Sequence, residues 1–122
     1  MKKLLLVLSM TIFAGTAALF AHEGHDGKPI TVIGQVVDTG CYIHHDSKGA
    51  DHADCAKMCA KAGVPLAILD DKGKLYLPIA TDHKNQNVKL MPFIEQKVKV
   101  TGLAYDKGGL AGIAIKTIEV SK

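Results

Sequence analysis

Apolar residues at every second position, separated by turns of aspartate and glycine, are the feature that most limits the folds open to this chain. Five segments carry this alternation: 30–38, 66–69, 74–79, 98–105 and 110–120. The turn sequences DDKG and DKGG join the second segment to the third and the fourth to the fifth, which is typical of hairpins. Side chains of a strand alternate between two faces, so the pattern predicts five strands and a mainly β protein.

Three irregularities interrupt this pattern. Gly34 lies inside the first strand, where it predicts a bulge or the close approach of another backbone. The last strand changes phase near Lys116 and Thr117. A short helical turn is expected within 88–95, interrupted by Pro92, before the fourth strand.

The order of these elements is that of an OB-fold, a small five-stranded Greek-key barrel. The chain resembles the bacterial OB-fold family of small exported proteins in the sequences VIGQVV, LDDKGKLYLPI, KVKVTG and GIAIKTIEV. The resemblance covers 30–38 and 64–120, and it implies an OB-fold-like barrel and a location in the cell envelope. It stops at 39–63, which we interpret as an insertion after the first strand, and it implies nothing about the chemistry of that insertion.

The insertion at 39–63 contains the signals of one helix. Asp51 is a candidate N-cap, Gly63 is a candidate left-handed stop, and Pro65 cannot continue a helix. Alanine, the best helix former, recurs between these signals. We therefore predict one helix over 52–62, inserted between the first strand and the rest of the barrel.

The first residues have the order of a secretory signal. Lys2 and Lys3 precede an apolar run at 4–14, and small residues then lead to Ala21. We expect export to the periplasm or to the medium. The expected organisation is a signal peptide at 1–21, a flexible mature N-terminus at 22–29 and a single domain at 30–122.

Charge and hydropathy exclude two classes of partner. The apolar run is about a third too short for a membrane span, so we expect no stable membrane anchor. Removal of 1–21 takes away two lysines and no acidic residue, which lowers the formal net charge from +3 to +1. Arginine, the usual side chain for bidentate recognition of phosphate and guanine, is absent from the sequence, so we expect no binding to nucleic acid. We also expect a monomer.

All three cysteines and three of the six histidines lie in the sequence CYIHHDSKGADHADCAKMC, which runs from Cys41 to Cys59. On a helix, positions 52, 55 and 59 share one face, and a turn at Thr39-Gly40 would present Cys41 opposite that face. Thiolate and imidazole are the ligands that Cu(I) and Zn(II) prefer. We therefore predict a copper or zinc site made by Cys41, Cys55, Cys59 and His52, with His44, His45 and Met58 as weaker candidates.

Two other uses of the cysteines stay open. Cys41 could form a disulfide with Cys55 or Cys59, closing a loop of about 15 to 19 residues and stabilising the fold by roughly 3 kcal/mol. The remaining thiol could then exchange with that disulfide. Alternatively, the cysteines are the buried face of the helix. His44 and His45 are adjacent, so in an extended loop only one of them would face Cys41.

These patterns favour an exported protein without enzymatic activity that handles a soft metal or confers metal tolerance. Its expected partners are a metal ion or an envelope protein. One alternative is an OB-fold module that is stabilised by one disulfide and binds a peptide, glycan or protein. The other alternative is a thiol-redox partner. The sequence has no nucleophile elbow, phosphate loop or haem-attachment motif. His22 and His25, at the mature N-terminus, offer weak binding of divalent metal.

Overall fold

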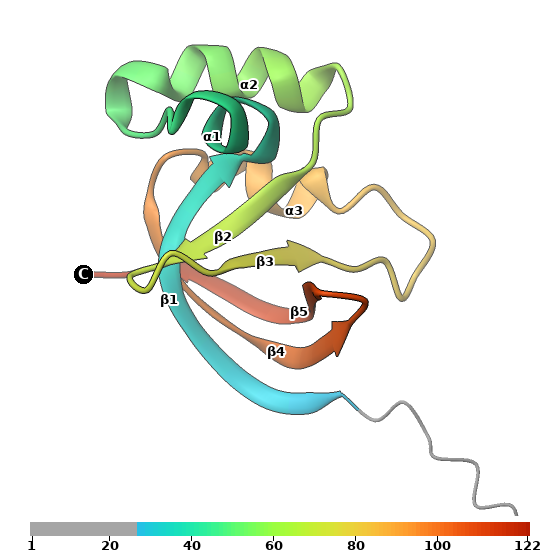
Figure 1. Ribbon diagram of the computed structural model, residues 1–122. Coiled ribbons are helices and arrows are strands. Elements are labelled where there is room, and N and C mark those ends of the chain that lie inside the picture. Colours follow the sequence, from blue (N-terminus) through green and yellow to red (C-terminus); the bar gives the residue numbers. More distant parts are fainter. Residues whose placement is uncertain (1–26) are drawn as a thin grey trace, which may run out of the picture.

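Five β-strands form the body of the protein in the computed structural model, which describes residues 27–122 (Figure 1). They are β1 (Lys28–Asp38), β2 (Leu66–Asp70), β3 (Leu75–Pro78), β4 (Lys97–Lys107) and β5 (Leu110–Val120). β1 begins two residues earlier than the first strand that the sequence predicted. The predicted signal peptide at 1–21 and residues 22–26, with His22 and His25, lie outside the described residues.

The strands close into a barrel in the order β1-β2-β3-β5-β4. β1 is long and curved, and it is antiparallel to β4 along its first part and to β2 along its last part (Figure 1). β3 and β5 pair in parallel through Leu77–Gly112 and Pro78–Ile113, and this pairing closes the barrel. The remaining strand pairs are antiparallel. The topology is OB-like, and it confirms the predicted mainly β, five-stranded barrel.

β1 changes partner at Gly34, which pairs with both Asp70 of β2 and Val98 of β4. A Cβ atom on Gly34 would lie 2.4 Å from the carbonyl oxygen of Leu69. No larger residue fits there without a backbone shift, so the structure confirms the close approach that the sequence predicted.

The β4–β5 hairpin contains the predicted change of phase. Thr101 pairs with Thr117 and Gly102 pairs with Ile115, so Lys116 is an extra residue on β5. An extra residue of this kind is a β-bulge, which bends the strand and increases its twist. The bulge therefore helps β5 to follow the curve of the barrel.

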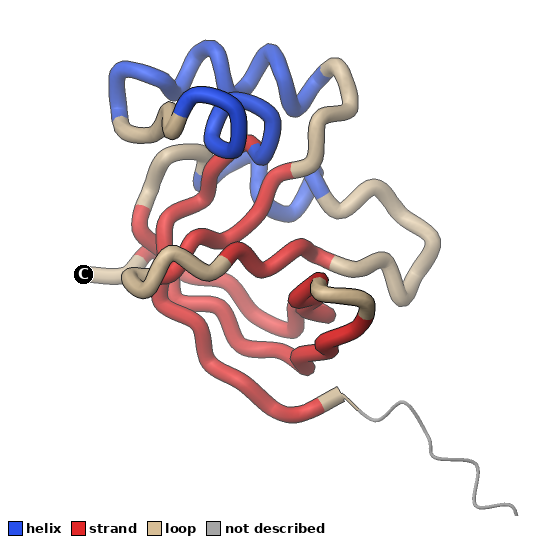
Figure 2. The backbone as a smooth tube through the Cα atoms, in the orientation of Figure 1, coloured by secondary structure: helices blue, strands red, loops and turns tan. Residues whose placement is uncertain are grey.

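Apolar side chains from all parts of the barrel fill one core. The buried side chains that the strands contribute to this core cluster are Val32, Val36, Leu66, Ile68, Tyr76, Val98, Val100 and Ile113. Ala56 and Ala60, from the insertion, belong to the same cluster, as do Leu90 and Ile94. The helical segments therefore cover one end of the barrel and share its core (Figure 2).

Two helices and a 3₁₀ turn follow β1: α1 (Thr39–His45), η1 (Ala50–His52) and α2 (Ala53–Lys61). The predicted single helix at 52–62 corresponds to α2, whereas the prediction of a turn at Thr39-Gly40 is wrong, because α1 begins there. α3 (Asn87–Leu90) and η2 (Met91–Phe93) are the helical turn predicted before β4. None of the helices in 27–122 is long and apolar enough to span a membrane.

Candidate metal centre

Asp38, the last residue of β1, starts α1. Its backbone is extended, at φ −78° and ψ 134°, and its Oδ1 accepts a hydrogen bond of 2.8 Å from the backbone N–H of Cys41. This is the geometry of an N-cap, which satisfies one of the unpaired donors at a helix start. The cap fixes Cys41 in the first turn of α1, directly after the barrel strand.

α2 presents the other two cysteines. Cys55 and Cys59 are four residues apart, so their side chains leave the helix on the same face. Ala56 and Ala60 are buried against the core and hold this helix on the barrel. The chain enters α2 through η1, and no side chain caps the helix, so Asp51 is not the N-cap that the sequence predicted.

The side chain of Asn87 fixes the C-terminal end of α2. Its Nδ2 donates to the carbonyl oxygens of Ala60, at 3.2 Å, and Val64, at 2.8 Å. Its Oδ1 accepts from the N–H of Leu66 at 2.9 Å. Asn87 is buried, so these bonds tie the end of α2 and the start of β2 to α3. Cys59 lies in the last turn of α2, and its carbonyl oxygen accepts a hydrogen bond of 3.0 Å from the N–H of Val64.

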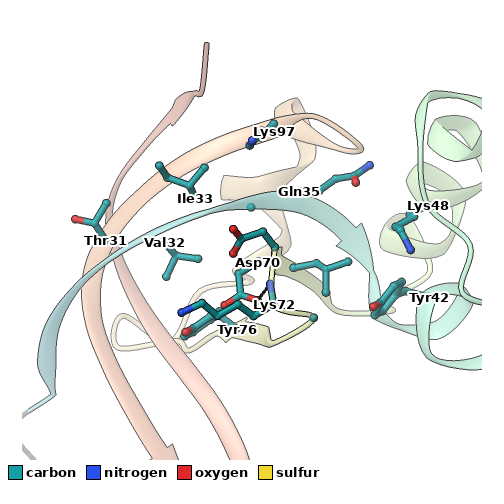
Figure 3. A pocket seen from close by; sticks show the side chains of 14 residues that line it. Thr31, Val32, Ile33, Gln35, Tyr42, Lys48, Asp70, Lys72, Tyr76 and Lys97 are labelled. Atoms are coloured by element: carbon teal, nitrogen blue, oxygen red, sulfur yellow. Dashed lines mark hydrogen bonds between the residues drawn. The ribbon is translucent and has the colours of Figure 1, made fainter.

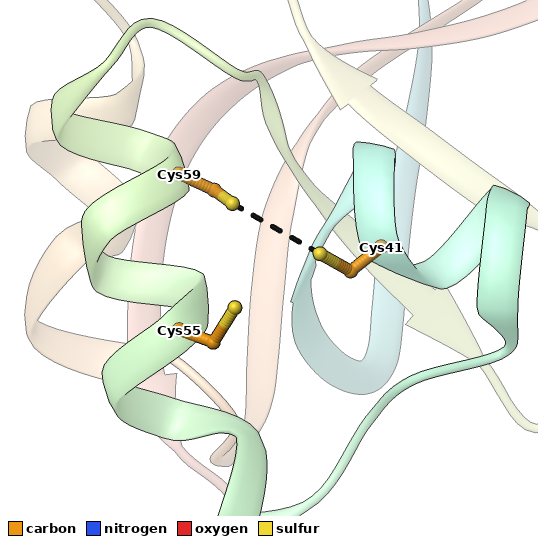
Figure 4. Close-up of side chains that lie close together, drawn as sticks. All are labelled: Cys41, Cys55 and Cys59. Atoms are coloured by element: carbon orange, nitrogen blue, oxygen red, sulfur yellow. Dashed lines mark hydrogen bonds between the residues drawn. The ribbon is translucent and has the colours of Figure 1, made fainter.

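The three sulfur atoms converge between α1 and α2 (Figure 4). The Sγ atoms of Cys41 and Cys59 are 3.9 Å apart, and the Sγ atoms of all three cysteines lie within 4.8 Å of one another. All three are free thiols and half-buried. Three thiolates this close can bind one metal ion from three sides, so the group is a candidate metal site.

The thiol of Cys41 is strongly biased toward its protonated form. Desolvation raises its pKa to about 12, with the hydrogen bond to Cys59 and the negative charge of Asp38 acting in the same direction. The metal ligand is the thiolate, so a metal ion must displace this proton. Metal binding at Cys41 is therefore expected to release a proton at neutral pH.

A second group of possible ligands adjoins the sulfurs. The Nε2 atom of His52 lies 2.8 Å from Oδ2 of Asp38, and these two side chains form a group with Cys41 whose ligand atoms lie within 4.8 Å of one another. Asp38 is fully buried, and the side chain of His52 is 15% exposed. Burial alone raises the pKa of Asp38, but the bonds from the Cys41 N–H and from His52 outweigh it, so the pKa is lowered.

The structure places His52 with Asp38 and Cys41, and not in the group that contains all three sulfurs. The weaker candidates lie elsewhere. His44 and His45 are exposed at the end of α1, with Nδ1 of one 2.6 Å from Nε2 of the other, and neither forms a ligand group with the cysteines among the described residues. They lie on a helix and not in the extended loop that was expected. Met58 is 67% exposed.

Asp38 and Asn87 are the residues of this centre that the sequence reasoning missed. Asp38 follows the apolar residues of the first strand, so the sequence indicates only that the strand ends there. Its position three residues before Cys41, and before Thr39-Gly40, is nevertheless an N-cap signal that could have indicated α1. No local pattern indicates Asn87, because its partners lie 21 to 27 residues away.

A separate groove of about 920 Å³ runs over β1 and the β2–β3 turn (Figure 3). Tyr42 and Lys48 lie at one end of the groove, and Tyr76 and Lys97 are also among its lining residues. Tyr42 follows Cys41 on α1, so this helix contributes to both the groove and the sulfur cluster. The lining of the groove combines aromatic, charged and apolar side chains.

The geometry thus combines an OB-like barrel, a two-helix insertion, three clustered thiols and a buried aspartate–histidine pair. Comparisons of the chain with protein-family models, with curated proteins and with solved structures found no match.

Proposed function

We propose that this protein binds one soft metal ion, Cu(I) in preference to Zn(II), through the thiolates of Cys41, Cys55 and Cys59. The observation that carries the proposal is that three sulfur atoms lie within 4.8 Å of one another. They come from two helices, and Cys41 and Cys59 are 18 residues apart in the sequence. Soft thiolates select soft metals, and the cysteines are half-buried and not in the closed core.

The number of sulfurs favours Cu(I). Structural Zn(II) sites are tetrahedral and use four protein ligands, whereas three thiolates suffice for a trigonal Cu(I) site. The predicted fourth ligand, His52, does not belong to the group that contains all three sulfurs. A three-sulfur site without a fourth side chain therefore fits Cu(I) better than Zn(II).

The proposed role is metal handling or metal tolerance outside the cytoplasm, in the periplasm or after secretion, without catalysis. Half-buried sulfurs support exchange of the ion with an envelope partner, because an incoming ligand can reach the metal before all three sulfurs have left it. The groove that begins at Tyr42, next to Cys41, provides a surface for such a partner beside the centre.

Native mass spectrometry of the mature protein, purified without an affinity tag or chelator, tests this function. We expect one copper ion per chain in the wild type, retention in Met58→Leu, and loss in Cys59→Ser. Met58→Leu is the matched control, because Met58 precedes Cys59 on the same helix and its side chain is largely exposed. A metal-free protein that is two hydrogens lighter than the reduced chain would refute the proposal and would establish a disulfide.

The 3.9 Å between the sulfurs of Cys41 and Cys59 favours a second candidate function, that of a thiol-redox partner. In this reaction the thiolate of one cysteine attacks a disulfide of a partner protein, and the resulting mixed disulfide is resolved by the other cysteine. The two cysteines lose two electrons and two protons, and the partner disulfide is reduced to two thiols. A Cys41–Cys59 bond would leave Cys55 as the free thiol.

A further inference from the structure

We infer that the centre has a second metal position, for a divalent ion of borderline character such as Zn(II), made by Asp38, His52 and the sulfur of Cys41. This inference rests on the proposed function, because Cys41 would be shared with the Cu(I) ion bound by the three sulfurs. The carboxylate, the imidazole and the thiol of this group lie within 4.8 Å of one another. A thiolate has enough lone pairs to bridge two metal ions.

The two carboxylate oxygens of Asp38 have different partners. Oδ1 accepts from the N–H of Cys41 and caps α1, while Oδ2 faces Nε2 of His52 at 2.8 Å. Two ligands bound at about 2.1 Å to a tetrahedral ion lie about 3.4 Å apart, so the pair would open by roughly 0.6 Å. An ion can therefore replace the proton between Asp38 and His52 without disturbing the helix cap.

The ligand set differs from that of the three-sulfur position. One imidazole nitrogen, one carboxylate oxygen and one thiolate form a mixed set of the kind found in open Zn(II) sites, where water is the fourth ligand, whereas Cu(I) selects sulfur. The two positions would thus discriminate between metals by their ligands. The side chain of His52 is 15% exposed, so this position lies close to the surface although Asp38 is fully buried.

Charge gives an independent reason for a second cation. Cu(I) bound by three thiolates leaves two net negative charges, and the carboxylate of Asp38 adds a third beside them. Within 27–122, His52 is the only basic side chain with a nitrogen within 4.0 Å of the Asp38 carboxylate. Uncompensated negative charge in a partly desolvated site is costly, and a divalent ion between Asp38, His52 and Cys41 offsets it.

The test loads the reduced protein with one equivalent of Cu(I) and then titrates it with Co(II), a spectroscopic substitute for Zn(II). We expect sulfur-to-cobalt charge-transfer bands in the wild type, and their loss when Zn(II) is added. Asp38→Asn keeps an oxygen that can cap α1 but removes the anionic ligand, and His52→Ala removes the imidazole. Each variant should bind Co(II) about tenfold more weakly or worse. His52→Ala, whose imidazole lies outside the three-sulfur group, should take up Cu(I) as the wild type does. His44→Ala, at an exposed histidine of α1, is the matched control and should behave as the wild type.

Two outcomes would overturn the second position while leaving the proposed function intact. One is a Cu(I)-loaded wild type that shows no cobalt bands, and the other is equal Co(II) affinity in the wild type, Asp38→Asn and His52→Ala. Failure of all the proteins to take up Cu(I) would instead refute the proposed function, and the second position with it. Circular dichroism establishes whether each variant is folded. If Asp38→Asn does not fold, His52→Ala alone tests the second metal position.

Discussion

The carboxylate of Asp38 is fully buried at the end of β1, and its two oxygens serve two different parts of the insertion. One oxygen holds the first turn of α1, and the other holds His52, the last residue of η1. A buried charge is stable only where its hydrogen bonds are satisfied. The position of Cys41 therefore depends on the hydrogen bond that its backbone N–H donates to Asp38.

The lowered pKa of Asp38 predicts how acid acts on the metal-free protein. A carboxyl group whose pKa is lower in the folded state than in the unfolded state adds stability above its ordinary pKa of 3.8. That stability is lost as the pH falls through the lower, folded-state value. The free energy of unfolding of the wild type should therefore decrease more steeply below about pH 3.8 than that of Asp38→Asn.

Urea unfolding of both proteins over this pH range measures the difference. Asp54→Asn, which removes an exposed carboxylate of α2, is the control and should follow the wild type. Parallel curves for the wild type and Asp38→Asn would contradict the role given to the buried carboxylate.

At the scale of elements, the centre depends on how the ends of α2 are held. The hydrogen bonds of Asn87 fix its C-terminal end. Asn87→Ala should lower the free energy of unfolding by about 3 kcal/mol, because three backbone groups lose their partner in a buried place. Chemical denaturation measures this loss.

Gln96→Ala is the control for Asn87→Ala, because the exposed side chain of Gln96 also bonds a backbone carbonyl. Its effect should stay within about 0.5 kcal/mol. Equal stability of the two variants would show that the Asn87 network does not hold the insertion in place.

Elements whose pattern spans many residues could be predicted from the sequence, and elements that depend on one distant or buried contact could not. β5 was predicted with its bounds and its change of phase near Lys116 and Thr117, because alternation over eleven residues is a strong signal. α1 was missed, since its sequence TGCYIHH contains a glycine and two β-branched residues, and a buried cap on Asp38 stabilises it. The clustering of the three cysteines followed from their spacing, but the separation of His52 from the complete cluster did not.

At the scale of the whole molecule, the barrel holds the insertion through hydrogen bonds from separate segments of the chain. Glu95, between η2 and β4, accepts hydrogen bonds of 2.7 Å from Gln35 of β1 and from the backbone N–H of Gly49 in the insertion. Its backbone has a positive φ of 60°, which non-glycine residues seldom adopt. Glu95 therefore helps the fold to set the position of the insertion relative to the barrel.

A preformed site makes a direct prediction about the bound ion. We propose that all three thiolates bind the same copper ion. X-ray absorption spectroscopy at the copper edge measures the neighbours of the ion in the Cu(I)-loaded mature protein. Three sulfur neighbours in the wild type, and two in Cys55→Ser, are the predicted result. Two sulfurs in the wild type, or a nitrogen or oxygen neighbour in place of the third sulfur, would contradict a three-cysteine Cu(I) site.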